Sequence, residues 1–201
     1  TDSFCIHDTK LTSIDVSNNT ELRTLSLTSN RISSIDVSNN RELQVLDVAS
    51  NNLTSLDLSN NSKLGVLDCR RNPIKTLNVS HCLGLSHLHC SSCELSSLDV
   101  SQLTNMRCLN VNENEIQELD VSKMQELGIL YCMNNKIPEL DLTNSPHLTE
   151  LMCGANLLSE LNVAKNKMLT MLECSGNNLE ELDLYNNTKI EILRCGGNKM
   201  I

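Results

Sequence analysis

The sequence predicts a repeat solenoid that is mainly β: a right-handed coil with parallel strands on its concave face and a second short extended stripe in each coil. Three observations predict this fold. Asparagine recurs on one lattice of 21 residues, apolar residues alternate with polar ones beside it, and only three of the 201 residues are aromatic. An interior without large aromatic rings indicates many small, similar layers of leucine, isoleucine, valine and cysteine.

The lattice asparagines define the repeat. No residue is inserted or lost between copies; Cys93 fills the one gap in the series, and Thr9 extends it backwards. The lattice positions are Asn30, Asn51, Asn72, Asn114, Asn135, Asn156, Asn177 and Asn198. We expect each of these side chains to lie inside the coil where the strand turns, bonding backbone groups that would otherwise have no partner.

A short apolar segment before each lattice asparagine has the alternation of a half-buried strand. Leucine occupies the position five residues before the asparagine in every complete coil, and Phe4 occupies it in the first. A smaller apolar residue follows two positions later, giving the column Ile6, Leu27, Val48, Cys69, Cys90, Val111, Cys132, Cys153, Cys174 and Cys195. Since one coil cannot bury its own apolar edge, equivalent strands must stack and pair in parallel.

A second apolar set follows each asparagine, for example Ile32, Ile35 and Val37. It predicts the second extended stripe of each coil. Residues 1–201 are therefore expected to form a single domain of about nine and a half coils without recognisable terminal caps. Solenoid ends normally carry a polar cap, so bare ends predict end-to-end association of copies or a chain that is a piece of a longer one.

The whole unit runs Leu-x-x-Leu-x-Leu/Cys-x-x-Asn and continues Leu-x-x-Leu-Asp-Leu/Val-Ser-x-Asn. It resembles the leucine-rich repeats, and specifically the nested 21-residue bacterial class called IRREKO, over residues 1–201. It resembles the internalin type less, because the second half of that type lacks the recurring Leu-Asp-Val-Ser. The resemblance implies a leucine-rich-repeat coil, a bacterial protein that is secreted or attached to the cell surface, and a role in recognition.

Charge and motifs exclude several function classes. Sixteen basic residues stand against 25 acidic ones, a formal net charge of −9, which argues against a nucleic-acid partner. No apolar run approaches the roughly 18 residues of a membrane span, so direct membrane insertion is not expected. We found no glycine-rich phosphate loop, Ser-His-Asp arrangement or isolated pair of acids. The sequence thus predicts no enzyme, no catalytic residue and no cofactor.

The concave strand face is the remaining candidate site, and its C-terminal part should carry a contiguous apolar patch. Such patches mark contact surfaces, and tyrosine with pliable methionine suits protein recognition. The predicted binding residues are Ile129, Tyr131, Met133, Glu150, Met152, Met171, Glu173, Ile192 and Arg194, with His87 and His89 further along the same face. A structural spacer and a targeting module for a missing domain stay open as alternatives, as does packing of the patch against such a domain or a symmetry partner.

A metal or thiol-dependent site is a further alternative. The 21-residue spacing should bring Asp68 beside His89 and His87 beside Cys108, and imidazole, carboxylate and thiolate are transition-metal ligands. The sequence indicates no supporting group, so no metal site is predicted. Six of the ten cysteines instead share one core column, where buried thiols act as small hydrophobic side chains. Their redox state does not follow from the sequence.

Two acidic columns run along the second stripe. Their members are Glu118, Glu139, Glu160 and Glu181 in one column and Asp15, Asp36, Asp57, Asp99, Asp120, Asp141 and Asp183 in the other. A ribbon of carboxylates could bind a hard cation such as Ca²⁺. The favoured reading is that each aspartate accepts backbone hydrogen bonds in the following turn, while the glutamates stay solvated near Lys123, Lys136 and Lys165.

Overall fold

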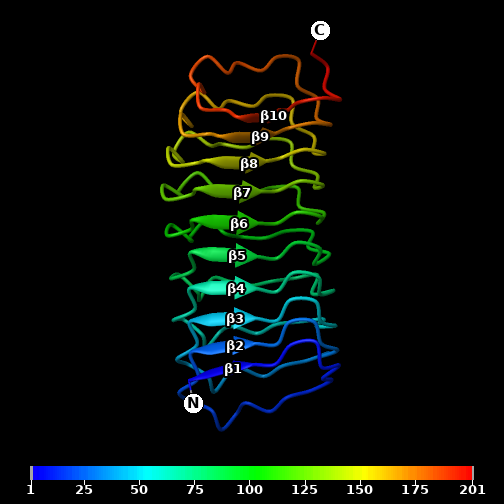
Figure 1. Cartoon of the computed structure of the whole chain (residues 1–201), viewed down its shortest axis with the longest axis vertical. Coiled ribbons are helices and arrows are strands. Elements are labelled where there is room, and N and C mark those ends of the chain that lie inside the picture. The colour runs from blue at the N-terminus through cyan, green and yellow to red at the C-terminus, as the bar shows by residue number, and fades with distance from the viewer. Residues whose placement is uncertain (1, 201) are drawn as a thin grey trace.

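Ten short strands form one parallel sheet in the computed structural model, which describes residues 2–200 (Figure 1). The strands stack in chain order, each three residues long. They are β1 (Ser3–Cys5), β2 (Thr24–Ser26), β3 (Val45–Asp47), β4 (Val66–Asp68), β5 (His87–His89), β6 (Cys108–Asn110), β7 (Ile129–Tyr131), β8 (Glu150–Met152), β9 (Met171–Glu173) and β10 (Ile192–Arg194). The predicted parallel β-solenoid is confirmed.

The pairing register follows the sequence lattice throughout. Each strand residue lies opposite the residue 21 positions further on, as Leu46 lies opposite Leu67. The middle residue of each strand from β2 to β9 is buried, and its neighbours on either side face outward. One face of the sheet therefore lines the core, and the other forms an uninterrupted surface, here called the strand face.

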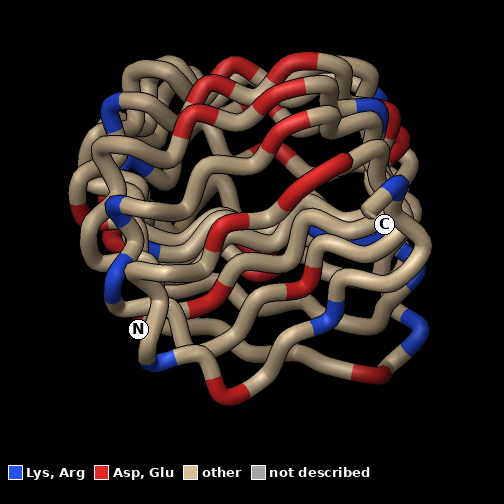
Figure 2. The backbone as a smooth tube through the Cα atoms, turned by 90° about the horizontal axis from the view of Figure 1, so that it is seen from above, with Lys and Arg blue, Asp and Glu red and all other residues tan. Residues whose placement is uncertain are grey.

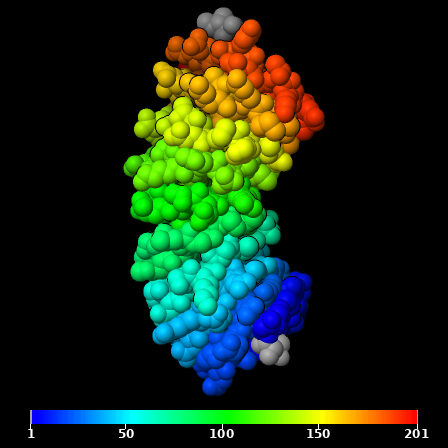
Figure 3. All heavy atoms as spheres, turned by 90° about the vertical axis from the view of Figure 1, so that its left-hand side faces the viewer, coloured from blue at the N-terminus to red at the C-terminus, as the bar shows by residue number. Residues whose placement is uncertain are grey.

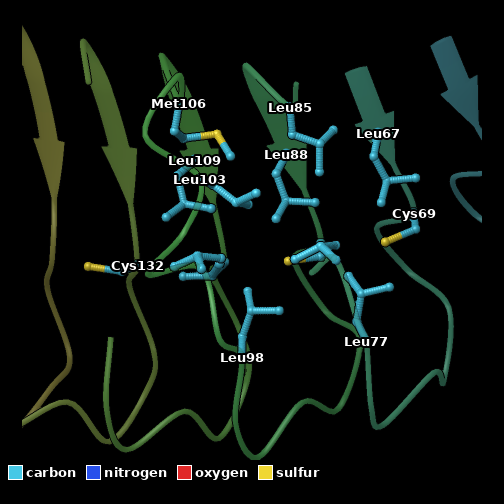
Figure 4. Packing of buried hydrophobic residues seen from close by; sticks show 14 of the residues in the cluster. Leu67, Cys69, Leu77, Leu85, Leu88, Leu98, Leu103, Met106, Leu109 and Cys132 are labelled. Atoms are coloured by element: carbon cyan, nitrogen blue, oxygen red, sulfur yellow. The ribbon is translucent and has the colours of Figure 1, made fainter. Parts of the chain in front are cut away.

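The core is a stack of nearly identical layers. Strand leucines such as Leu88 and Leu109 point toward second-stripe leucines such as Leu98 (Figure 4). The cysteine column lies in the same layers. Cys132 is fully buried, and burial raises the pKa of its thiol to about 12. All ten cysteines are free thiols, so those of the column act as the predicted packing residues.

The second stripe packs into the core as the prediction requires. Its residues are buried as expected, with Ile32 and Val37 each only 1% exposed. No hydrogen-bonded strand forms there within residues 2–200; a tight turn follows the stripe, closed by the Asn40 amide on the Val37 carbonyl at 3.0 Å. The stripe is thus held by packing and turns rather than by a second sheet.

The lattice asparagines hold the strand-end turn as predicted. The Asn51 side-chain oxygen accepts the Ile32 amide at 3.0 Å, and its nitrogen donates to the Leu27 and Val48 carbonyls at 2.9 and 3.0 Å. The preceding residue is left-handed in every coil, with Ser50 at φ 55°. Asparagine therefore fixes a turn that its neighbour adopts at a cost. Cys93 keeps part of this role, because its thiol donates to the Cys69 carbonyl at 3.2 Å.

A second asparagine ladder lies on the opposite side of the coil, and our sequence reasoning missed it. The Asn61 side-chain nitrogen donates to the Val37 and Asn40 carbonyls at 3.1 and 2.9 Å, while its side-chain oxygen is buried without a partner. The ladder members are Asn40, Asn61, Asn166 and Asn187, and between them the same position holds Cys82, Leu103, Met124 and Ser145. The signal was present in the sequence as the same 21-residue spacing.

The stack is bowed. In side view the middle coils are set back from both ends on the side that carries the strands, so the strand face is concave (Figure 3). No helix in residues 2–200 has the length and apolar character that crossing a bilayer requires.

Candidate functional site

The strand face presents two outward columns of side chains, one from the first and one from the third residue of each strand, followed here from β2 to β10. The first column runs Thr24, Val45, Val66, His87, Cys108, Ile129, Glu150, Met171 and Ile192. The second runs Ser26, Asp47, Asp68, His89, Asn110, Tyr131, Met152, Glu173 and Arg194. Polar and titratable groups dominate the second column up to β6, whereas apolar side chains dominate both columns from β7 to β9.

The apolar part is here called the C-terminal strand patch, and the structure brings its predicted members together. Adjacent-strand partners include Ile129 with Glu150 and Tyr131 with Met152. Most members are half-buried, so the apolar side chains among them keep part of their surface open to a partner. The patch residues are Ile129, Tyr131, Met133, Glu150, Met152, Met171, Glu173, Ile192 and Arg194.

Tyr131 is fixed at the centre of the patch. Its hydroxyl donates a short hydrogen bond to the carboxylate of Glu150 on the next strand. Burial, together with this hydrogen bond, raises the pKa of Tyr131 to about 12, so the ring carries a neutral hydroxyl at physiological pH. The bond also fixes the direction of the Glu150 carboxylate.

Glu173 is the most enclosed acid of the patch. Its side chain is only 5% exposed, and one carboxylate oxygen accepts the Ser175 amide at 3.0 Å. The carboxylate lies over Gly154, where a β-carbon would come within 2.6 Å of that oxygen. A glycine on the neighbouring coil therefore makes room for an acid inside an otherwise apolar surface.

The N-terminal half of the strand face carries the other predicted residues. Asp68 lies opposite His89, and His87 opposite Cys108, as the spacing predicts. Arg70 approaches Asp68 to 3.4 Å. The His87 ring nitrogen Nδ1 bonds the Ser86 hydroxyl at 2.9 Å, whereas Nδ1 of His89 is buried without a partner.

Burial disfavours the charged forms of three of these groups. Burial raises the pKa of Asp68, an effect partly offset by Arg70, and burial lowers the pKa of His89. Burial also raises the pKa of the Cys108 thiol, which disfavours the nucleophilic thiolate. Within the part of the chain that the structure describes, no three or more His, Cys, Asp or Glu side chains converge as a metal ion would require.

A hydrogen-bonded chain at the N-terminal end was not predicted. His7 bonds the Ser26 hydroxyl at 2.7 Å, and that hydroxyl donates to Asp47 at 3.2 Å. The bonds link side chains of three successive coils. The register places Ser26 opposite Asp47, whereas His7 lies beyond the end of β1 and reaches Ser26 through its side-chain conformation.

The acidic columns occupy the side of the coil opposite the strands, where acidic residues gather in rows (Figure 2). The prediction for the aspartates is confirmed: Asp120 accepts the Ser122 hydroxyl at 2.6 Å and the Ser122 amide at 3.0 Å, which lowers its pKa. Lys136, expected near the glutamate column, forms its ion pair with Glu115 outside that column, at 3.1 Å. Glu118, Glu139 and Glu160 line a shallow surface groove.

The chain superimposes on the functional domain of InlJ from Listeria monocytogenes with a TM-score of 0.98 and 35% identity, covering 99% of this chain and 45% of InlJ. The chain is a leucine-rich-repeat protein. The InlJ domain is described as including a cysteine ladder. This leucine-rich-repeat protein spans less than half of the InlJ chain.

Two more distant structures share the fold. Internalin F from Listeria monocytogenes is 24% identical, with a TM-score of 0.79 over 99% of this chain and 68% of its own. A leucine-rich-repeat protein of Leptospira interrogans is 20% identical, with a TM-score of 0.73 over 94% of this chain and 59% of its own. The internalins are thus more similar in structure to this chain than we expected from the second half of its repeat unit, which differs from the internalin pattern. No family model matches the chain, and no curated protein matches it.

Proposed function

We propose that this leucine-rich-repeat protein is a non-catalytic scaffold that binds a protein partner through the C-terminal strand patch. The observation that carries the proposal is the cluster of half-buried apolar side chains on β7 to β9, open on the concave side of the sheet. Proteins that stay monomeric rarely expose such a cluster without use. Methionine adapts to the shape of a partner, and tyrosine supplies a large contact area with a polar tip.

The chemistry of the rest of the surface supports a binding role over a catalytic one. The densest group of titratable residues, around Asp68 and His89, has its charged forms disfavoured by burial. The aspartates on the opposite side are engaged in their own turns. Both sets of groups are therefore poorly suited to act as an acid, base or nucleophile.

We also propose that the protein acts outside the bacterial cytoplasm, secreted or at the cell surface. The family resemblance and the internalin neighbours support this location. Labelling of intact cells of the source organism with an antibody against the chain tests it. We expect signal without permeabilisation, and signal that needs permeabilisation would contradict the proposal.

Charge introduced into the patch tests the binding role. We expect Met152→Glu with Met171→Glu to abolish capture of the partner, because carboxylates would be buried at the contact. The matched control places Val45→Glu and Val66→Glu in the first column of the N-terminal half, where both valines are also half-buried. Capture of proteins from the source organism and from the cells it contacts would be quantified by mass spectrometry.

The outcomes separate the alternatives. Proteins retained by the parent and by the control variant, but lost by the patch variant, support the proposal. Equal retention by the parent and both variants would show that the binding site lies outside the patch. If the parent retains nothing, the spacer becomes the better account. Circular dichroism and thermal unfolding of each variant show that the coil is intact.

A further inference from the structure

The C-terminal strand patch contains a checkerboard of two acids and two methionines. Glu150 lies opposite Met171, and Met152 lies opposite Glu173, so the carboxyl residues occupy one diagonal of the block and the methionines the other. From strand spacing and rise, the two acidic positions are about 8 Å apart along that diagonal. A cation placed between them would approach both carboxylates and rest on methionine side chains.

Both carboxylates are oriented before any partner arrives. The Tyr131 hydroxyl holds Glu150, and the Ser175 amide at 3.0 Å holds Glu173. Each hydrogen bond comes from a neutral donor, so neither compensates the negative charge. Acids fixed in this way lose little further freedom on binding a cation.

No basic residue of the described chain pairs with either acid. The four ion pairs in residues 2–200 join Lys63 to Glu42, Arg70 to Asp68, Lys75 to Glu94 and Lys136 to Glu115. Asp68, on the N-terminal half of the same face, thus has its own cation, whereas the two acids of the patch do not. Arg194 lies opposite Glu173 in the register but is exposed and forms no ion pair in this part of the chain.

Taking the C-terminal strand patch as the binding site of the proposed function, we infer that its partner is a protein segment with a lysine or arginine flanked by apolar side chains. The basic group would sit between Glu150 and Glu173, and the apolar neighbours would cover Ile129 on one side and Met171 on the other. Charge-assisted hydrogen bonds away from bulk water are the strong ones. The net charge of −9 also favours encounter with a basic partner.

Tyr131 adds to the selectivity. Its ring lies beside Met152 in the register, next to the position of the inferred cation. Aromatic rings attract ammonium and, more often, guanidinium groups over their faces. An acidic segment would instead meet two carboxylates of its own sign in an apolar setting.

A random peptide library displayed on phage tests the inference. The library is selected on the intact chain, and the enriched peptides are measured against three variants. Glu150→Gln with Glu173→Gln removes the charge but keeps acceptors for the Tyr131 and Ser175 donors. The matched control, Glu139→Gln with Glu160→Gln, makes the same change in net charge at two exposed acids on the opposite side. The third variant is Met152→Glu with Met171→Glu.

We expect enriched peptides to carry lysine or arginine between apolar residues. They should bind the Glu150 and Glu173 variant about tenfold or more weakly, and bind the control like the parent. Peptides that require Met152 and Met171 but lack a basic residue, or tolerate loss of both patch acids, overturn the inference and leave the proposed function standing. Equal loss on the control also overturns it, by showing only general charge attraction. If the peptides bind the variant with Met152→Glu and Met171→Glu as well as they bind the parent, or if no peptide is enriched, the result counts against the proposed function as well.

Discussion

The two asparagine ladders satisfy different backbone groups. The strand-end ladder consists of the lattice asparagines, such as Asn135, and in residues 2–200 these side chains are the sole partners of some backbone groups. The Ile116 amide bonds only the Asn135 oxygen, at 3.0 Å, and the Val111 and Cys132 carbonyls accept only from lattice asparagines. In the opposite ladder, the Val37 carbonyl that Asn61 bonds already accepts the Asn40 amide at 3.0 Å.

The difference explains why one ladder is nearly unbroken and the other is not. Where a side chain is the only partner of a buried backbone group, replacing it leaves that group unsatisfied, which is costly. Where the asparagine side chain only adds a second hydrogen bond to a carbonyl that already has a backbone partner, an apolar residue can replace the asparagine. Leu103 and Met124 do so, donating no side-chain hydrogen bond while staying fully packed.

The largest expected effect is at the strand-end ladder. Asn135→Ala should lower the free energy of unfolding by about 3 kcal/mol, because the Ile116 amide loses its partner and three carbonyls each lose a donor. Urea denaturation followed by circular dichroism measures it. Asn52→Ala, at an exposed asparagine, is the control and should change little. An unchanged curve for Asn135→Ala would refute the sole-partner explanation.

A smaller effect is expected at the second ladder. Asn61→Ala should cost about 1 kcal/mol, because the Val37 and Asn40 carbonyls keep their backbone partners and a buried oxygen without a partner is removed. The same denaturation experiment measures it. A loss as large as that of Asn135→Ala would remove the distinction between the ladders.

The cysteine column beside the strand-end ladder should be more tolerant still. Cys153→Val should cost less than about 1 kcal/mol, since Val48 and Val111 occupy the same column in other coils. Thermal unfolding of the variant under reducing conditions measures this. A markedly lower midpoint would mean that the thiol contributes more than its volume.

The smallest effect is expected at Asp68 and depends on pH, whereas neither ladder titrates. Burial raises the pKa of this carboxyl, so the folded chain holds the proton more tightly than the unfolded chain. Stability contributed by Asp68 therefore falls as the pH rises from the ordinary aspartate pKa through the raised folded value. Asp68→Asn should unfold at higher denaturant than the parent above that window, and the difference should vanish below it. A constant difference across pH would contradict this account.

Much of the candidate site could be read from the sequence, because the 21-residue lattice assigns each residue to a strand and a column. The apolar cluster from Ile129 to Met171 and the pairing of His87 with Cys108 follow from that lattice alone. The hydrogen bond from Tyr131 to Glu150 does not, since it crosses the register diagonally and depends on side-chain conformation. The enclosure of Glu173 over Gly154 likewise requires the packing of two neighbouring coils.

The sequence by itself determined the coil length, the parallel register and the residues that face inward, because a period repeated without insertion leaves one way to stack the apolar stripes. Only the tertiary structure decided which side chains are the sole partners of buried backbone groups and which acids stay without a cation. Those properties depend on the atoms that neighbouring coils bring within bonding distance, and residues of the same type, such as Asn61 and Asn135, differ in them although both follow the 21-residue period.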